Sequence, residues 1–129
     1  MGKYLIDTNI LLEILLRQEK SSICKNFLDD HEDHELCISD FTLHSIGLIL
    51  LNRKDYEGYN IFADYFLPKL KIKSLRKNIF DVFGHTFKFT KLDYDDFYQY
   101  WVAVEEGLTL VTLDSDFKKV SKDIPVVFL

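Results

Sequence analysis

The stretch Leu92–Phe117, LDYDDFYQYWVAVEEGLTLVTLDSDF, predicts a helix, a tight turn, a buried strand and an acidic loop in that order. Asp93 has the side chain of a helix N-cap, and Gly107 is the residue type that commonly follows a helix C-terminus in the left-handed conformation. We therefore expect a helix through Glu106. Its apolar side chains recur at i, i+3, i+4 and i+7, which predicts one buried stripe. The stripe comprises Phe97, Tyr100, Trp101 and Val104.

The segment after the turn predicts a buried strand that ends in acids. Leu108–Leu113 is almost continuously apolar and β-branched, as in a parallel strand covered on both faces. Asp114 and Asp116 follow it, and open α/β sheets bind ligands at the carboxyl ends of their strands. Each acid also has a structural alternative. Asp114 and Asp116 could form only a turn, and Asp96 could serve only to complement the helix dipole.

The amino terminus repeats this arrangement of a strand followed by an acid. Lys3–Ile6 has the pattern of a short strand, and Asp7 and Asn9 lie between it and an apolar helical pattern. If the two strands are neighbours, Asp7, Asp114 and the helix start near Asp96 converge on one crevice. Carboxylates about 6 Å apart repel by roughly 3 kcal/mol per pair at an effective dielectric constant of about 20. A cation would relieve that repulsion, and oxygen ligands of this kind suit Mg²⁺ or Mn²⁺.

These motifs resemble the PIN-domain family, a metal-dependent nuclease fold that includes VapC-type toxins. The motifs are IDTN at residues 6–9, an acid that opens a late helix, and GLTLVTLDSDF at residues 107–117. The resemblance covers nearly the whole chain and implies that Asp7, Asp96 and Asp114 occupy acidic metal-site positions, with Asp116 as a frequent fourth. It also implies a three-layer α/β/α domain with a mainly parallel five-stranded sheet in the order 3-2-1-4-5.

One segment departs from the usual pattern of the family. Most members carry a glutamate in the helix that Ser39 would cap here, and Ser45 stands at that position. The segment SDFTLHSIG, residues 39–47, resembles a PIN subgroup with SDF-x-LHSIG. Asp40 could supply the missing carboxylate, Ser45 could act through water, and His44 could be a ligand or proton carrier, since histidine titrates near neutral pH. Alternatively, His44 and Ser45 simply pack on an otherwise apolar helix.

Charge is unevenly distributed along the chain. The net charge of −5 argues against a broadly basic surface for nucleic acid, but an acidic metal site is compatible with a nuclease because bound cations reverse its local sign. Basic residues concentrate in one short segment and are candidates for binding substrate phosphates. An equally simple interpretation is a solvated strand edge that lysines protect from aggregation. The segment contains Lys69, Lys71, Lys73, Arg76 and Lys77.

Periodicity predicts the remaining elements. The charged segment Asp29–Glu35 and residues Lys88–Lys91 are predicted as connections, and Asn9 is an accessory candidate beside Asp7. The helix after Ser39 is apolar all round over residues 46–51, so we expect both of its sides to be buried, in the core or against another chain. One helix is predicted to begin near Ser21 or Ser22, and three others span Asp40–Leu51, Asp55–Phe66 and Lys77–Phe87. The predicted strands are Leu36–Ile38, Leu70–Leu75 and Val126–Leu129.

Length and composition predict a single domain over residues 1–129. Cys24 and Cys37 lie in apolar surroundings without metal-type spacing, so we expect reduced core residues. No signal-peptide pattern opens the chain, and its apolar runs are too short to span a bilayer, which favours a cytoplasmic location. Aromatic residues make up 15% of the chain, more than a small core readily absorbs, so some are candidates for an interface.

The sequence therefore leads to a hypothesis of a Mg²⁺- or Mn²⁺-dependent ribonuclease with Asp7, Asp96, Asp114 and Asp116 as its acids. The family resemblance implies an RNA substrate, a homodimer and, for a toxin, a small antitoxin protein. One alternative is a PIN-fold module that binds RNA or protein and has lost turnover. The other is a phosphatase-like α/β hydrolase, although Asp7-Thr8-Asn9 does not match the nucleophile loop of that class.

Overall fold

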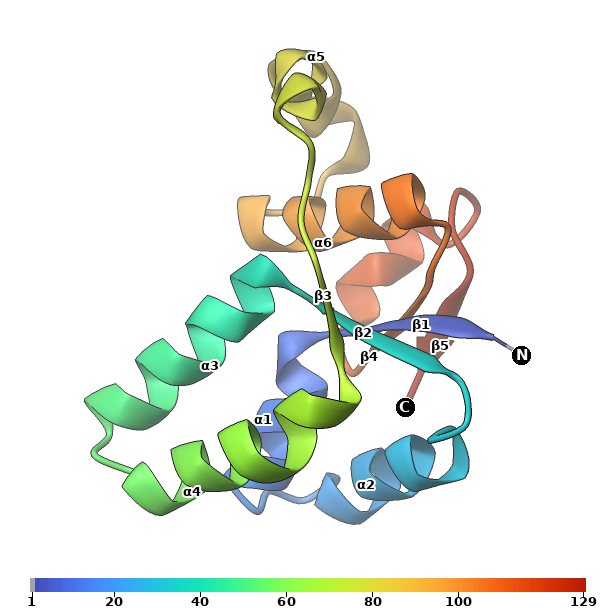
Figure 1. Ribbon diagram of the computed structural model, residues 1–129. Coiled ribbons are helices and arrows are strands. Elements are labelled where there is room, and N and C mark those ends of the chain that lie inside the picture. The colour runs from blue at the N-terminus through green and yellow to red at the C-terminus, as the bar shows by residue number, and fades with distance from the viewer. Residues whose placement is uncertain (1) are drawn as a thin grey trace.

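The computed structural model describes residues 2–129, in which a five-stranded sheet lies between two layers of helices (Figure 1). The strands follow the order β3-β2-β1-β4-β5, and every neighbouring pair is parallel. This confirms the predicted sheet. The strands are β1 (Lys3–Ile6), β2 (Glu35–Ser39), β3 (Lys71–Lys73), β4 (Thr109–Thr112) and β5 (Val126–Phe128).

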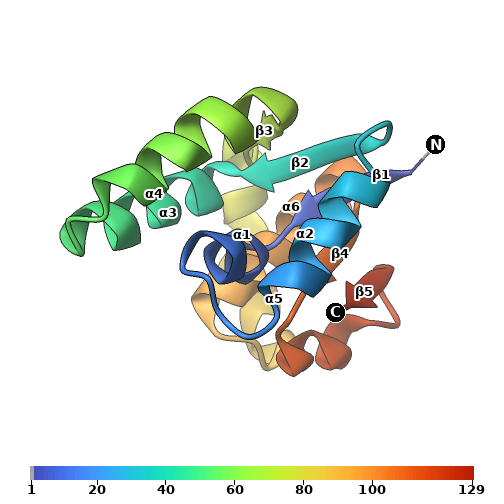
Figure 2. The same ribbon diagram turned by 90° about the horizontal axis from the view of Figure 1, so that it is seen from below.

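Helices cover both faces of the sheet, as the predicted three-layer architecture requires. Seen from below, α1 and α2 lie in front of the strands and α6 lies behind them (Figure 2). A π-helical segment, Phe62–Phe66, continues α4, and three short 3₁₀ segments complete the chain at Leu67–Lys69, Lys77–Ile79 and Ser115–Val120. The helices are α1 (Thr8–Leu15), α2 (Ser21–Asp30), α3 (Asp40–Asn52), α4 (Tyr56–Ile61), α5 (Phe80–Thr90) and α6 (Tyr94–Glu106).

Two hydrophobic cores lie on opposite faces of the sheet. Successive strand residues enter different cores: Leu5 and Leu110 pack under α5 and α6, whereas Ile6 and Val111 pack under α1, α3 and α4. Because neighbouring residues of a strand point to opposite faces, both must be apolar when both faces are covered. The continuous apolar run of the fourth strand therefore has a direct structural cause.

Several element boundaries differ from the predicted ones. The strand expected over Leu70–Leu75 contains only Lys71–Lys73, because β3 is an edge strand that pairs with β2 over three residues. Residues 88–90, predicted as a connection, are the last turn of α5, which ends where Lys91 adopts a left-handed φ of 60°. Gly107, with φ of 62°, ends α6 in the conformation that its sequence predicts.

The predicted buried stripe of α6 is confirmed for three of its four residues. Phe97 is fully buried, and Tyr100 and Trp101 pack against the same core, but Val104 is 40% exposed. The aromatic side of the helix packs on α5, where the rings of Phe83 and Phe97 lie 4.8 Å apart. The side over the sheet is two residues out of phase, on nearly the opposite side of the helix, and carries Gln99, Val102 and Ala103.

Two further expectations concern α3 and the cysteines. The helix buries Ile46 and Leu50 but leaves Leu48 52% exposed, so the core of this chain covers only one side, and burial of the other side against another chain stays a prediction. Cys24 and Cys37 are buried, unpaired, and in different cores, as expected of reduced core residues. Among residues 2–129, no helix combines the length and apolarity needed to cross a membrane.

Candidate metal centre

The carboxyl ends of β1 and β4 bring the predicted acids together. The two strands pair in parallel, and the register continues past β1, where the backbone N–H of Asp7 donates to Val111 O at 2.9 Å. Asp7 caps α1, and Asp114 lies two residues beyond the end of β4. Asp96 approaches from the first turn of α6, which Asp93 caps by accepting from the Asp96 N–H at 3.1 Å.

Asp96, Asp114 and Asp116 form a compact group of carboxylates. One oxygen from each lies within 4.8 Å of the others. The loop after β4 fixes two of them, because Asp114 Oδ1 accepts from the Asp116 N–H at 2.8 Å and the Asp114 N–H donates to Thr112 Oγ1 at 2.9 Å. Together with Asp7, these residues are called the acidic centre below.

Burial and nearby like charges change the titration of Asp96. Burial raises the pKa of Asp96 to about 8, and the negative charges of Asp93, Asp114 and Asp7 add to the shift. At 4.8 Å, two carboxylate charges repel by about 3 kcal/mol at an effective dielectric constant of about 20. A divalent cation among these oxygens would remove that cost.

The donor set fits a hard divalent cation. Mg²⁺ binds carboxylate oxygens at about 2.0–2.1 Å, so two oxygens on opposite sides of one ion lie about 4.2 Å apart. The separations in the group reach 4.8 Å, which small side-chain movements would close. An oxygen-only set also favours Mg²⁺ or Mn²⁺ over metals that prefer nitrogen or sulfur ligands.

Asp7 lies beside this group but accepts its hydrogen bonds from the protein. The residue is 6% exposed. Its Oδ1 accepts from the Thr8 N–H at 2.8 Å and from Gln99 Nε2 at 3.1 Å, and its Oδ2 accepts from Thr112 Oγ1 at 2.7 Å. Burial raises the pKa of Asp7, and these hydrogen bonds offset part of that effect. Asp7 is therefore a fixed acid at the back of the centre, outside the compact group of three.

A buried polar network behind Asp7 was not identified from the sequence. Gln99 donates to Thr42 Oγ1 at 2.9 Å and accepts from the Ser39 hydroxyl, while Thr8 and Thr42 share a hydrogen bond at 2.8 Å. The available signal was spacing, because Gln99 lies three residues after Asp96 and therefore on the same side of α6. Ser39 was predicted only as the cap of α3, a role that the structure confirms through its hydrogen bond from the Thr42 N–H.

The accessory candidates have separate environments. Asp40 is exposed and accepts from the Tyr98 hydroxyl at 2.8 Å, and His44 is exposed nearby on a shallow surface. Ser45 is half-buried on α3. Asn9 lies at the strand ends, where its Oδ1 accepts from the Leu113 N–H at 3.3 Å. Of these candidates, Asn9 is thus directly tied to the loop that carries Asp114.

The basic segment follows the β3 edge of the sheet and is largely paired. Lys71 Nζ lies 2.7 Å from Glu35, and Lys73 Nζ lies 3.8 Å from Glu106. Arg76 donates to Glu105 Oε2 at 3.0 Å, and Lys69 Nζ lies 3.7 Å from the centre of the Tyr65 ring. These contacts support the strand-edge interpretation, and a role in binding RNA stays a prediction.

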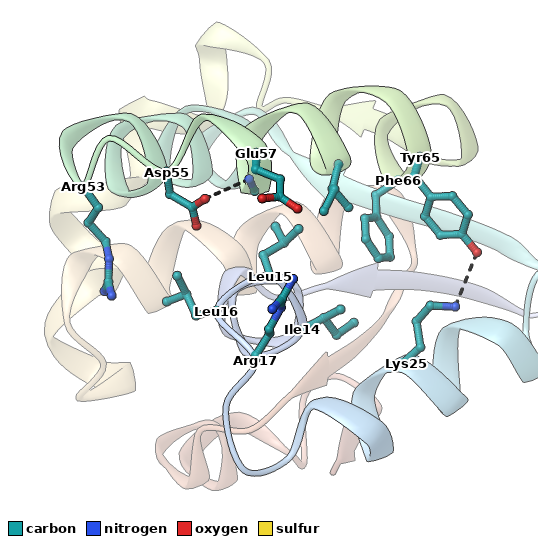
Figure 3. Close-up of a pocket in the computed structure, with 12 residues that line it drawn as sticks. Ile14, Leu15, Leu16, Arg17, Lys25, Arg53, Asp55, Glu57, Tyr65 and Phe66 are labelled. Carbon is teal, nitrogen blue, oxygen red and sulfur yellow. Dashed lines mark hydrogen bonds between the residues drawn. The ribbon is translucent and has the colours of Figure 1, made fainter.

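A cavity of about 490 Å³ lies at the other end of α1 from Asp7 (Figure 3). Leu15 and Arg17 line it from the end of α1, and Ile61 and Tyr65 line it from the α4 side. Figure 3 shows Lys25 reaching Tyr65, whose hydroxyl accepts from Nζ at 3.4 Å. None of the acids of the acidic centre lines this cavity, so the cavity is not the candidate metal site.

The fold has clear structural relatives. It superposes on FitAcB from Neisseria gonorrhoeae with a TM-score of 0.79 at 20% identity, covering 96% of each chain. VapBC2 from Rickettsia felis, bound to a DNA fragment, gives 0.77 at 21% identity, covering 95% of this chain and 96% of that one. PAE2754 from Pyrobaculum aerophilum gives 0.66 at 21% identity, covering 98% and 91%.

Sequence comparison gives a family assignment at the level of the whole domain. No protein with a curated function matches this chain. The PIN-domain model, however, matches residues 4–123, a range that contains all four acids and most of both cores. From the fold, the acids at the carboxyl ends of β1 and β4 and this match, we conclude that the chain belongs to the PIN-domain family.

Proposed function

We propose that this protein is a Mg²⁺- or Mn²⁺-dependent ribonuclease whose acids are Asp7, Asp96, Asp114 and Asp116. The observation that carries the proposal is the group of three carboxylates within 4.8 Å, which α6 and the loop after β4 contribute, beside Asp7 at the end of the neighbouring parallel strand β1. Family membership supports a hydrolase role, because PIN domains are in general nucleases. An acidic group of this kind favours a cation over a bare phosphate.

The residues of the centre have distinct roles in this proposal. Asp96, Asp114 and Asp116 would supply ligand oxygens, and Asp7 would contribute through Oδ2. A bound divalent cation would hold the scissile phosphate and lower the pKa of a water molecule that attacks phosphorus. Since the pKa of Asp96 is about 8, this carboxyl must release its proton at neutral pH before it can act as a ligand.

The test is cleavage of a mixed RNA pool by the wild type and by the Asp7→Asn, Asp114→Asn double variant. We expect Mn²⁺-dependent cleavage by the wild type, no cleavage in chelator, and loss of cleavage in the double variant. Asp123→Asn is the matched control, because Asp123 is an exposed acid outside the centre. Cleavage that persists in chelator or in the double variant would refute the proposal.

A second candidate function is a PIN-fold module that binds RNA or protein without turnover. The observation that favours it is Ser45, which stands on α3 where most family members carry a glutamate. The same experiment separates the two functions, because the module would bind Mn²⁺ and leave the RNA intact. Hydrolysis of a simple phosphate monoester would instead favour the phosphatase-like alternative.

We also propose an antitoxin partner, a homodimer and a cytoplasmic location. The similarity to FitAcB and VapBC2 supports the partner, and VapBC2 is bound to DNA from the promoter. Leu48 and Leu51 on α3 are 52% and 42% exposed and could contribute to an interface. Sedimentation of the purified chain tests the homodimer, and a monomer at micromolar concentration would contradict it.

A further inference from the structure

We propose that Gln99 is the positioning residue of the acidic centre and that its amide leaves Asp7 Oδ2 as the oxygen available to a cation. The inference rests on the proposed metal site. It concerns a side chain that contacts Asp7 and two hydroxyl groups and is 1% exposed. Gln99 would therefore act through Asp7 without contacting the cation or RNA.

Hydrogen bonding fixes the orientation of the Gln99 amide. Both Nε2 hydrogens have acceptors, Asp7 Oδ1 at 3.1 Å and Thr42 Oγ1 at 2.9 Å. Oε1 accepts from the Ser39 hydroxyl. Rotating the amide by half a turn would place Oε1 against the Asp7 carboxylate, acceptor against acceptor. The network therefore selects one orientation, with the donor toward Asp7.

The hydrogen bonds to Asp7 divide its two oxygens unequally. Oδ1 accepts from the Thr8 N–H at 2.8 Å and from Gln99 Nε2 at 3.1 Å, which fills its two lone-pair positions. Within the described residues 2–129, Oδ2 accepts only from Thr112 Oγ1, at 2.7 Å, and keeps a second lone pair. Without Gln99, Oδ1 would also have a free position, and the carboxylate would no longer be limited to one ligand atom.

Gln99 also connects two segments that carry acids of the centre, α6 and the end of β1, with the start of α3. It lies one helical turn after Asp96 on α6, bonds to Asp7 after β1, and bonds to Ser39 and Thr42 where β2 passes into α3. The start of α3 thus contributes neutral hydroxyl groups. A neutral amide adds no negative charge to a group in which carboxylates already repel one another.

The first test measures Mn²⁺ affinity of the full chain by titration calorimetry. Gln99→Met keeps a similar side-chain length but removes the donors and the acceptor, so we expect affinity to fall by roughly 10- to 100-fold, as for partners that orient metal ligands. Val102→Ala is the matched control, because Val102 is a fully buried α6 residue outside the network. Its Mn²⁺ affinity should stay within about twofold of the wild type, since no ligand contact changes.

The second test uses nuclear magnetic resonance and needs no variant at position 99 to fold. The chain has only two glutamines, Gln18 and Gln99, so their side-chain NH₂ signals can be separated. We expect Mg²⁺ to shift the Gln99 signals in the wild type and to leave them unshifted in Asp7→Asn. A residue with a purely structural role would show no such dependence on Asp7.

The outcomes separate this inference from the proposed function. If the wild type binds Mn²⁺ and Gln99→Met binds it equally well, or if Mg²⁺ binding leaves the Gln99 signals unchanged, the positioning role is wrong and the metal site stands. Equal losses in Gln99→Met and Val102→Ala would likewise overturn it. If the wild type binds neither ion, the proposed function fails and this inference fails with it.

Discussion

At the start of β2, Glu35 lies 2.7 Å from Lys71 Nζ and 3.9 Å from Lys3 Nζ, and these neighbours lower its pKa. At the carboxyl edge of the same sheet, burial and then the charges of Asp93, Asp114 and Asp7 raise the pKa of Asp96 to about 8. The pKa of a carboxyl group is therefore lowered at one end of the strands and raised at the other.

The difference shows where this fold supplies its own cations. Lysines and arginines of the basic segment pair with Glu35, Glu105 and Glu106 along the β3 edge. Within residues 2–129, neither Asp96 nor Asp114 has a lysine or arginine partner, and Lys119 reaches Asp116 only at 3.9 Å. The acidic centre is thus the part of the sheet where a cation from solution has the most to neutralise.

The largest expected effect concerns catalysis at the two ends of α6. Asp96→Asn should lower Mn²⁺-dependent RNA cleavage by about 1,000-fold or more, because a correctly held metal supplies several kcal/mol of transition-state stabilisation. Glu105→Gln, at the other end of the helix, should leave cleavage unchanged, since Glu105 pairs with Arg76. Initial rates on one RNA substrate measure the effect of each substitution. Equal losses of cleavage in the two variants would contradict a special role for the acidic centre.

The second effect is the dependence of metal-free stability on pH. The folded pKa of Asp96, about 8, lies above its ordinary value of 3.8. Between these values the unfolded chain has lost a proton that the folded chain keeps, so stability falls as pH rises. Asp96→Asn should therefore melt higher than the wild type at pH 8, by roughly 3–6 °C after allowing for partial exposure, and nearly equally at pH 4.

Thermal unfolding in chelator at the two pH values measures this effect. Asp123→Asn, which removes an exposed acid outside the centre, is the control and should show no such change with pH. A difference of the same size at pH 4 and pH 8 would mean that the substitution acts through packing and that ionisation of Asp96 does not destabilise the fold.

A smaller effect of opposite sign is expected at the paired edge. The pKa of Glu35 is lowered from its ordinary 4.5, so its contribution to stability is present above that value and is lost as pH falls through the folded pKa. Glu35→Gln should lower the melting temperature at pH 7 by less than about 3 °C, and added salt should reduce the difference. A rise in melting temperature would contradict the assignment of Lys71 and Lys3 as its partners.

The smallest effect is expected for RNA binding by the basic segment. Lys71 and Lys73 already pair with carboxylates, so Lys71→Gln and Lys73→Gln should each weaken RNA binding by no more than about threefold and change the salt dependence by less than one unit of slope. Binding measured across a range of salt concentrations checks this. A reduction of the slope by about one per substitution would instead place RNA along the β3 edge.

The strands and the convergence of the acids could be predicted because they follow from local patterns. Continuous apolar runs require coverage on both faces, and acids placed directly after two such strands meet when the strands are parallel neighbours. Asp7 and Asp114 were found in this way, and Asp96 was found as an acid at the start of the helix that precedes β4. Their neighbourhood, however, depended on the strand order, which came from the family resemblance.

The role of Gln99 could not be predicted in the same way. The aromatic residues Phe97 and Trp101 dominate the apolar pattern of α6 and direct the predicted face toward α5, whereas the sheet-facing side includes a polar residue. A buried glutamine is stable only when its partners are present. Those partners, Ser39, Thr42 and Asp7, are distant in sequence and meet it only in the folded chain.

The end of β3 and the length of α5 could not be predicted from the sequence pattern either. Leu70–Leu75 alternates as a strand does, but an edge strand is only as long as its pairing with β2, which spans three residues. The predicted end of α5 was too early because Lys88 and Thr90 carry no stop signal, and the helix ends at the left-handed Lys91. Both boundaries depend on tertiary context.

The most direct measurement is calorimetric titration of the metal-free wild type with Mn²⁺ at pH 7 in two buffers of different ionisation enthalpy. We expect binding with release of a proton, because Asp96 keeps its proton at this pH until a cation displaces it. Asp96→Asn should bind more weakly and release fewer protons. Absence of Mn²⁺ binding at millimolar concentration, or equal affinity and proton release in wild type and variant, would contradict the account.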